Sequence, residues 1–137
     1  MYSQIMTSLN DNEDIKQESL DLTDIQDEND FQKIIQSIDA MYKNNKPFEM
    51  MIETNKVTKI QMKYIYRIGK YLHNIKNTYP KLLRYTCIHV YNNAIYNILY
   101  MLFTHLSNPI AKVTVIQYEP NAEKKEIKQI KNFYPRH

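Results

Sequence analysis

The chain of 137 residues contains one glycine, one cysteine and no tryptophan. A single glycine excludes a collagen-like repeat and a glycine-rich phosphate-binding loop. A single cysteine excludes a disulfide scaffold and a cysteine-rich zinc module. Arginine accounts for only three of the eighteen basic residues, although arginine is the side chain that most often recognises phosphates and base edges. The chain therefore lacks the residues on which several common functional sites are built.

Long apolar runs are also missing. The most apolar window, Ala94 to Leu106, spans thirteen residues, whereas a helix that crosses a bilayer needs about 20. Residues Met1 to Leu9 have neither the basic flank nor the continuous apolar core of a secretory signal. With Cys87 as the single thiol, these features predict a reducing, cytoplasmic location.

Four residue types dominate what is present. Ile, Lys, Asn and Tyr together supply 59 residues, and all four have codons rich in A and T, which indicates a mutational bias of the genome. Residues 1–39 carry a net charge of −8 and residues 40–137 a net charge of +11. Such a split can indicate a basic arm that binds nucleic acid or an anionic membrane, but we favour two oppositely charged surfaces on one globule.

The first part of the sequence predicts a hairpin followed by a helix. Tyr2 to Leu9 and Ile15 to Leu22 alternate partly between polar and apolar residues, with a turn-forming Asn and Asp cluster between them. From Asp27 apolar residues recur every three or four positions, with acids at the start, which predicts an amphipathic helix. This helix should end in Lys43 to Pro47.

Strand and helix patterns alternate over the rest of the chain. The pattern predicts strands at 48–54, 86–91 and 111–117, and helices at 58–78 and 94–107.

Two further features complete the pattern. Gly69 lies inside the second predicted helix, where glycine costs roughly 1 kcal/mol against alanine, so we expect a close approach of that helix to the sheet. Near the end of the chain, Ile127, Ile130 and Phe133 recur at three-residue steps, which predicts a charged helix at 122–133.

The predicted order of elements is therefore ββαβαβαβα in one α/β domain spanning 1–137, with an N-terminal hairpin at 1–22 and a core at 27–117. Strands that alternate with long helices require crossover connections, which place the strands parallel in one sheet. We expect a mostly parallel sheet of four to five strands with helices covering its faces.

Candidate catalytic and metal-binding residues do not form a recognisable set. The four histidines, at positions 73, 89, 105 and 137, have no His, Asp or Glu partner at the spacing of a helical metal site, so we expect no metal and no cofactor. Cys87 and His89 should share one face of a strand, which leaves open a thiol and base pair of an enzyme. Two neighbours on one strand are more often packing residues, and we expect no enzymatic activity. Tyrosines amid lysines could stack on bases, but several of them fall within or beside helices, where they should cover the edge of the core, so nucleic acid is an unfavoured partner.

The third predicted helix is apolar on most of its circumference. One side faces the core, and Tyr96, Tyr100, Met101 and Phe103 spread over the other side. A second apolar side could contact an apolar ligand, a partner subunit or a membrane surface, and the final helix could also cover it. These four residues are candidate ligand or partner contacts.

The region 30–117 resembles the sheet core shared by CRAL-TRIO lipid-binding domains and STAS domains. The resemblance to CRAL-TRIO domains rests on a strand ending in Glu53, a Tyr-Pro-x-x-Leu segment at Tyr79 to Leu83, a strand ending in Asn92, an apolar helix and Asn108-Pro109 before the next strand. It implies a module that binds a lipid or another apolar ligand.

The chain length and the predicted hairpin are closer to a STAS domain, a small module that binds partner proteins in regulatory assemblies. In that family a serine at the start of the helix after the second core strand is often a phosphorylation switch, and Thr58 is the nearest hydroxyl here. The resemblance implies ligand or partner contacts around this point, at Lys56, Thr58, Lys59 and Gln61. We therefore expect a CRAL-TRIO-like module for an apolar ligand or, alternatively, a STAS-like module for a partner protein, with a homo-oligomer or peripheral membrane contact left open.

Overall fold

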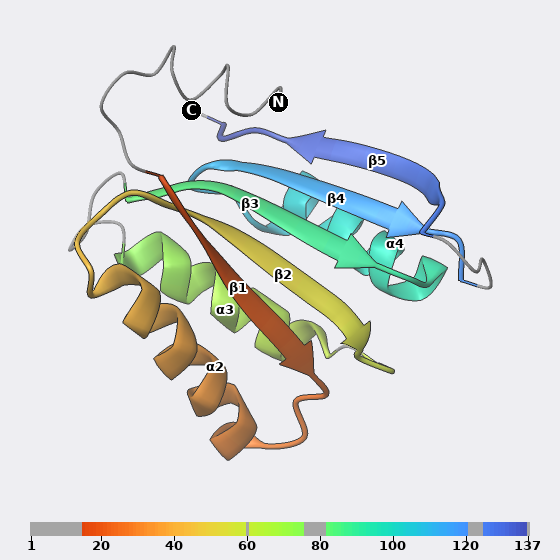
Figure 1. Cartoon of the computed structure of the whole chain (residues 1–137). Helices are drawn as coiled ribbons and strands as arrows, with labels where there is room; N and C mark the ends of the chain where they lie inside the picture. The colour runs from red at the N-terminus through yellow and green to blue at the C-terminus, as the bar shows by residue number, and fades with distance from the viewer. Residues whose placement is uncertain (1–14, 60, 76–81, 121–124, 137) are drawn as a thin grey trace, which may run out of the picture.

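The computed structural model describes residues 15–59, 61–75, 82–120 and 125–136, in which strands and helices alternate as an α/β fold of order βαβαβαββ (Figure 1). The elements are β1 (Lys16–Thr23), α2 (Glu28–Tyr42), β2 (Phe48–Lys56), α3 (Met62–Ile75), β3 (Leu83–Val90), α4 (Asn93–Met101), the π-helix η1 (Leu102–Leu106), β4 (Lys112–Tyr118) and β5 (Ile127–Phe133).

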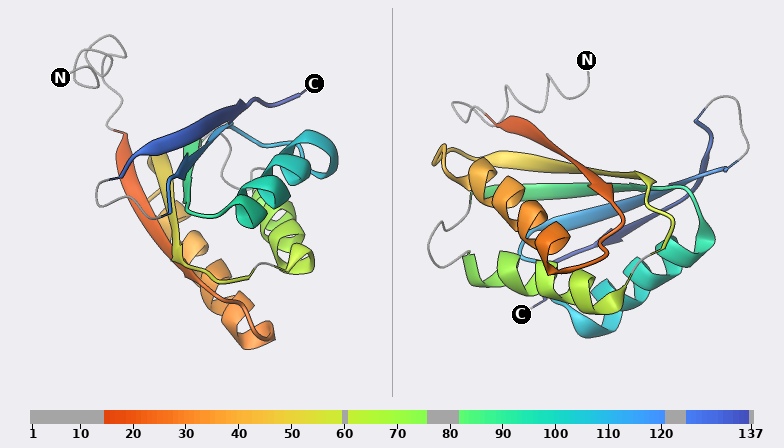
Figure 2. Two further views of the ribbon diagram at one scale, coloured as in Figure 1. Left: turned by 90° about the vertical axis from the view of Figure 1, so that its right-hand side faces the viewer. Right: turned by 90° about the horizontal axis from the view of Figure 1, so that it is seen from below.

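The five strands form one sheet in the order β1-β2-β3-β4-β5. The first four are parallel, as predicted, and β5 is antiparallel to β4. Crossovers of one hand between adjacent strands put every helix on the same side of a sheet. Accordingly α2, α3 and α4 all lie on one face (Figure 2). The expectation that helices would cover both faces is wrong, because it did not take the strand order into account.

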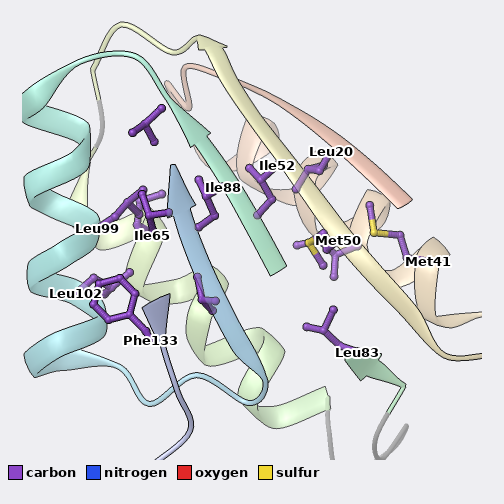
Figure 3. Packing of buried hydrophobic residues seen from close by; sticks show 14 of the residues in the cluster. Leu20, Met41, Met50, Ile52, Ile65, Leu83, Ile88, Leu99, Leu102 and Phe133 are labelled. Carbon is purple, nitrogen blue, oxygen red and sulfur yellow. The ribbon is translucent and has the colours of Figure 1, made fainter. Parts of the chain in front are cut away.

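The core lies between this face and the helices. Alternate strand residues point to opposite sides of a sheet, so β2 sends Met50 and Ile52 inward, and Ile88 of β3 lies beside them in register. Figure 3 shows these side chains facing Ile65 of α3 and Leu99 of α4. The positions between them, including Cys87 and His89, belong to the other face, over which no helix lies in the described part of the chain.

Helix α2 begins and ends as predicted. The Asp27 side chain caps its start by accepting a hydrogen bond from the Asp30 N–H at 2.9 Å, and Asp30 in turn accepts one from the Gln26 N–H at 3.0 Å. This reciprocal pair satisfies two N–H groups at the helix start. Past the end of the helix, Asn45 takes a positive φ of 53°, which asparagine tolerates better than most residues.

Helix α3 begins at Met62, later than the predicted start at Thr58. The carboxylate of Asp24 accepts hydrogen bonds from the Thr58 N–H at 2.8 Å, the Thr58 hydroxyl at 2.5 Å and the Lys59 N–H at 3.3 Å. The Thr58 bonds, chiefly, hold the pKa of Asp24 below its ordinary value. Because Asp24 comes from the distant end of β1, the sequence near Thr58 alone could not reveal this anchored turn.

The C-terminal segment is a strand, and the prediction of a helix at 122–133 is wrong for its described part. Ile130 pairs with Ile116, Ile127 pairs with Tyr118, and the register shifts between these pairs. The shift places both isoleucines on one face although they are three residues apart. Phe133, which pairs with Val113, lies on the helix-covered face. The three apolar residues therefore have the spacing of a helical stripe although they do not share one face.

The N-terminal hairpin is testable only in its second strand. Its first strand, Tyr2 to Leu9, lies outside the described residues. The second, expected at Ile15 to Leu22, is β1, which pairs in parallel with β2. None of the helices in the described ranges has the length and apolar character needed to cross a bilayer.

A charged pair links α2 to α3 on the surface. Arg67 donates two hydrogen bonds to the Glu28 carboxylate, at 2.7 and 2.9 Å, and its guanidinium lies 4.0 Å from the centre of the Phe31 ring. The hydrogen bonds from Arg67 lower the pKa of Glu28 from its usual 4.5 to about 2. The pair therefore stabilises the folded state fully above pH 4.5 and loses this contribution as the pH falls toward 2.

We expect Glu28→Gln to flatten the pH dependence of unfolding between pH 4.5 and 2, as measured by urea denaturation at each pH. Arg67→Gln should flatten it similarly, because either change removes the same pair. Flattening by one variant without the other would contradict this assignment.

Candidate functional site

An apolar cavity lies inside the core, between the sheet and the helices α3, α4 and η1. Its volume is about 110 Å³. The sheet contributes aliphatic side chains such as Leu20, Ile52 and Ile88, and the helices contribute others such as Ile65 and Leu99. Cavities lined in this way stay dry and accept compact apolar molecules: one of about 150 Å³ binds benzene or xenon. The cavity can thus hold a small apolar molecule, and Lys59 is the single charged side chain among its described lining residues.

The apolar faces of two helices build one side of this cavity. Ile65, Ile68 and Leu72 of α3 recur at three- and four-residue steps and all line it. Asn92 caps the start of α4 by accepting a hydrogen bond from the Ile95 N–H at 2.8 Å, and Ile95 is the first cavity-lining residue of that helix. The helical spacing of apolar residues in the sequence therefore determines which side chains of α3 and α4 face the cavity.

Gly69 also lines the cavity, but it does not approach the sheet closely as expected. A Cβ at this position would lie 3.3 Å from the Ser107 Oγ, just after η1. The close approach is therefore between α3 and the end of η1. The prediction of a close approach to the sheet is wrong: the neighbour of Gly69 is the Ser107 side chain, which would have to shift slightly to admit a Cβ.

The four residues expected to form contacts at the end of β2 and before α3 separate into two pairs. Lys59 and Gln61 line the cavity, and the Gln61 side chain also donates to the Ile25 carbonyl at 3.3 Å. Lys56 instead forms an exposed ion pair with Asp21 at 3.3 Å. The Thr58 hydroxyl donates to Asp24, so it is already engaged in the turn before α3.

The four candidates on the third predicted helix are divided similarly. Phe103 lines the cavity and lies 5.3 Å from the Phe133 ring. Tyr96 is buried, whereas Tyr100 and Met101 are 40% and 43% exposed on the outer side. The structure therefore brings Phe103, Lys59 and Gln61 to one cavity and leaves Tyr100 and Met101 outside it.

Cys87 and His89 lie on one face of β3, as predicted, with 3.8 Å between Sγ and Nε2. Burial raises the pKa of the Cys87 thiol and lowers the pKa of His89. The other ring nitrogen of His89, Nδ1, hydrogen bonds the Tyr118 hydroxyl at 2.7 Å. An activated nucleophile needs a lowered thiol pKa and access to solvent, and Cys87 has neither.

Two of the remaining histidines, His73 and His105, are exposed, and His137 lies outside the described residues. In the ranges that the structure describes, no three His, Cys, Asp or Glu side chains gather in a metal-binding arrangement.

Several residues of the cavity were missed by the sequence analysis. Leu22 of β1 and Ile25, in the loop that follows β1, both line the cavity. The loop from Asn108 to Ala111 closes part of it. Loop residues carry no periodic signal, so only the fold reveals their position. Comparison with known proteins adds no further residue, since no family model, curated protein or solved structure matches the chain.

Proposed function

We propose that the protein is a non-enzymatic binding module that holds an apolar ligand in the cavity between the sheet and α3, α4 and η1. The observation that carries the proposal is a largely apolar space of about 110 Å³ inside the hydrophobic core. Empty space in a core costs stability, because its lining loses contacts that a ligand would restore. The resemblance to CRAL-TRIO domains supports the same kind of ligand.

The size of the cavity limits the ligand. Pockets for drug-sized ligands measure roughly 300–1,000 Å³. At about 110 Å³ this cavity fits a molecule near the size of benzene, or the end of one hydrocarbon chain. We therefore propose a compact apolar ligand for the protein in this conformation.

Benzene is the probe that tests this proposal. At about ten times its Kd, it should raise the free energy of unfolding by about 1.4 kcal/mol, measured by urea denaturation. Val113→Phe should abolish this gain, because Val113 lines the cavity and a phenyl ring would fill it.

Val115→Phe is the matched control. Val115 is 1% exposed on the same strand and face but does not line the cavity. The added ring should therefore cost about 1–3 kcal/mol by overpacking, whereas the cost at Val113 should be smaller. Benzene that stabilises the wild type and Val113→Phe equally would contradict the proposal.

A partner protein is the second candidate, and the sheet face without helices favours it. Two large aliphatic side chains of the edge strand β5, Ile127 and Ile130, are 55% and 52% exposed there. Native mass spectrometry combined with solvent extraction of the purified protein separates the two candidates. A small apolar molecule that copurifies supports the first, and a stable oligomer without such a molecule supports the second.

A further inference from the structure

The wall of the cavity formed by residues 102–110 differs from the others. Leu102, Phe103 and the loop from Ser107 to Ile110 all line the cavity. The sheet, α3 and α4 form most of the other walls with regular hydrogen bonding. Here the chain instead passes from α4 through the π-helix η1 into an extended Ser107. π-Helices are rare and frequently mark functional sites.

The end of η1 leaves backbone carbonyls without partners inside the helix. The Ser107 N–H donates to the Leu102 carbonyl at 2.8 Å, and the chain then becomes extended. The later carbonyls of the segment cannot be satisfied by a following turn. They need partners from another part of the chain.

Arg136 supplies partners for two of these carbonyls. Its Nη1 donates to the Phe103 carbonyl at 2.7 Å, and its Nη2 donates to the Ser107 carbonyl at 3.0 Å. In addition, the Arg136 N–H donates to the Asn108 side chain at 2.7 Å, and that side chain donates back to the Arg136 carbonyl at 2.7 Å. A single residue that follows β5, Arg136, thus holds both ends of the wall segment 103–108.

The guanidinium suits this position for a physical reason. Its planar fork can bond two carbonyls in fixed directions at once, which a lysine ammonium does not reproduce. Arg136 is itself exposed, as are Thr104, His105 and Leu106 of η1. The segment is packed on its inner side by Leu102, Phe103, Pro109 and Ile110, whereas on its outer side the Arg136 contacts are what hold it.

We propose that Arg136 determines ligand size: it holds the segment 102–110 closed, so that the cavity admits compact apolar molecules and excludes long hydrocarbon chains. This inference rests on the proposed function. Release of Arg136 lets the segment move away from α3 and enlarges the cavity toward the size that a fatty acid chain needs.

The test compares the wild type with Arg136→Ala and Arg136→Lys. Two readouts are used: hydrogen exchange of residues 102–110 without ligand, and binding of benzene and of cis-parinaric acid, a long fluorescent fatty acid. We expect exchange in this segment to become at least tenfold faster in Arg136→Ala and intermediate in Arg136→Lys. Affinity for cis-parinaric acid should rise at least tenfold in Arg136→Ala, while affinity for benzene should change less than threefold.

Lys128→Ala is the matched control. Lys128 is another exposed cation of the β5 region, but it hydrogen bonds Asn93 at the opposite end of α4, at 2.9 Å. It should change neither readout. Unchanged exchange in Arg136→Ala, or equal acceleration by Lys128→Ala, would overturn the inference even if benzene binds. Faster exchange without any binding of benzene or fatty acid would instead refute the proposed function and leave Arg136 as the residue that holds the wall.

Discussion

Replacing Leu102 with alanine is expected to lower the free energy of unfolding by about 2–5 kcal/mol. Leu102 is 2% exposed, begins η1 and lines the cavity. The truncation removes its burial and adds its volume to the existing cavity, so the surrounding side chains have little opportunity to collapse inward. Urea denaturation of the two proteins measures the loss.

Benzene should then stabilise Leu102→Ala more than it stabilises the wild type, because the enlarged cavity fits the ring with more contacts. Ile75→Ala is the matched control, since Ile75 is buried in the same core but does not line the cavity. It should lose a comparable free energy and gain less from benzene. Equal gains in the two variants would indicate that benzene binds to any new void and not to the cavity described above.

The order of helices and strands from residue 27 to 117 was predictable because its signals are local. The helix at 28–42 combines a capping acid, acids in its first turn and apolar residues at three- and four-residue steps. The strand at 112–118 alternates and contains β-branched residues. In such segments the residues that fix the structure lie within a few positions of one another.

The errors occurred where distant residues decide the local structure. Asp24 delays the start of α3 by holding Thr58, which lies 34 residues away. The end of α4 becomes a π-helix, and its carbonyls are bonded by Arg136. In each case a hydrogen bond with a side chain from a distant segment changes the structure that the neighbouring residues favour. A single sequence does not show which segments meet.

The candidate site was predictable only in its chemistry. The apolar surplus of the third predicted helix indicated that something apolar contacts it, and Phe103 does line the cavity. Residues on both sides of that helix are apolar, so its sequence does not show which side faces the cavity. Consequently Tyr100 and Met101 were grouped with Phe103, although they lie on the outer side.

An equally large loss of stability is expected from a substitution in the C-terminal strand. We expect Phe133→Ala to lower the free energy of unfolding by about 3–5 kcal/mol. Phe133 is 7% exposed and pairs with Val113, and its ring lies 5.8 Å from the Tyr100 ring and 5.3 Å from the Phe103 ring. Losing it should therefore loosen both the attachment of β5 and the support behind a cavity-lining side chain.

Ile130→Ala and Ile127→Ala are the controls, because they distinguish the strand from the helix that the spacing predicted. On a helical stripe the two isoleucines and Phe133 would be buried together, and all three truncations would cost a similar amount. In the strand, Ile127 and Ile130 are more than half exposed on the face without helices, so each truncation should cost within about 0.5 kcal/mol of zero. Three similar losses in urea denaturation would favour the helix. One large loss at Phe133 beside two small ones follows only if the bulge between the β4 and β5 pairings turns both isoleucines away from the core.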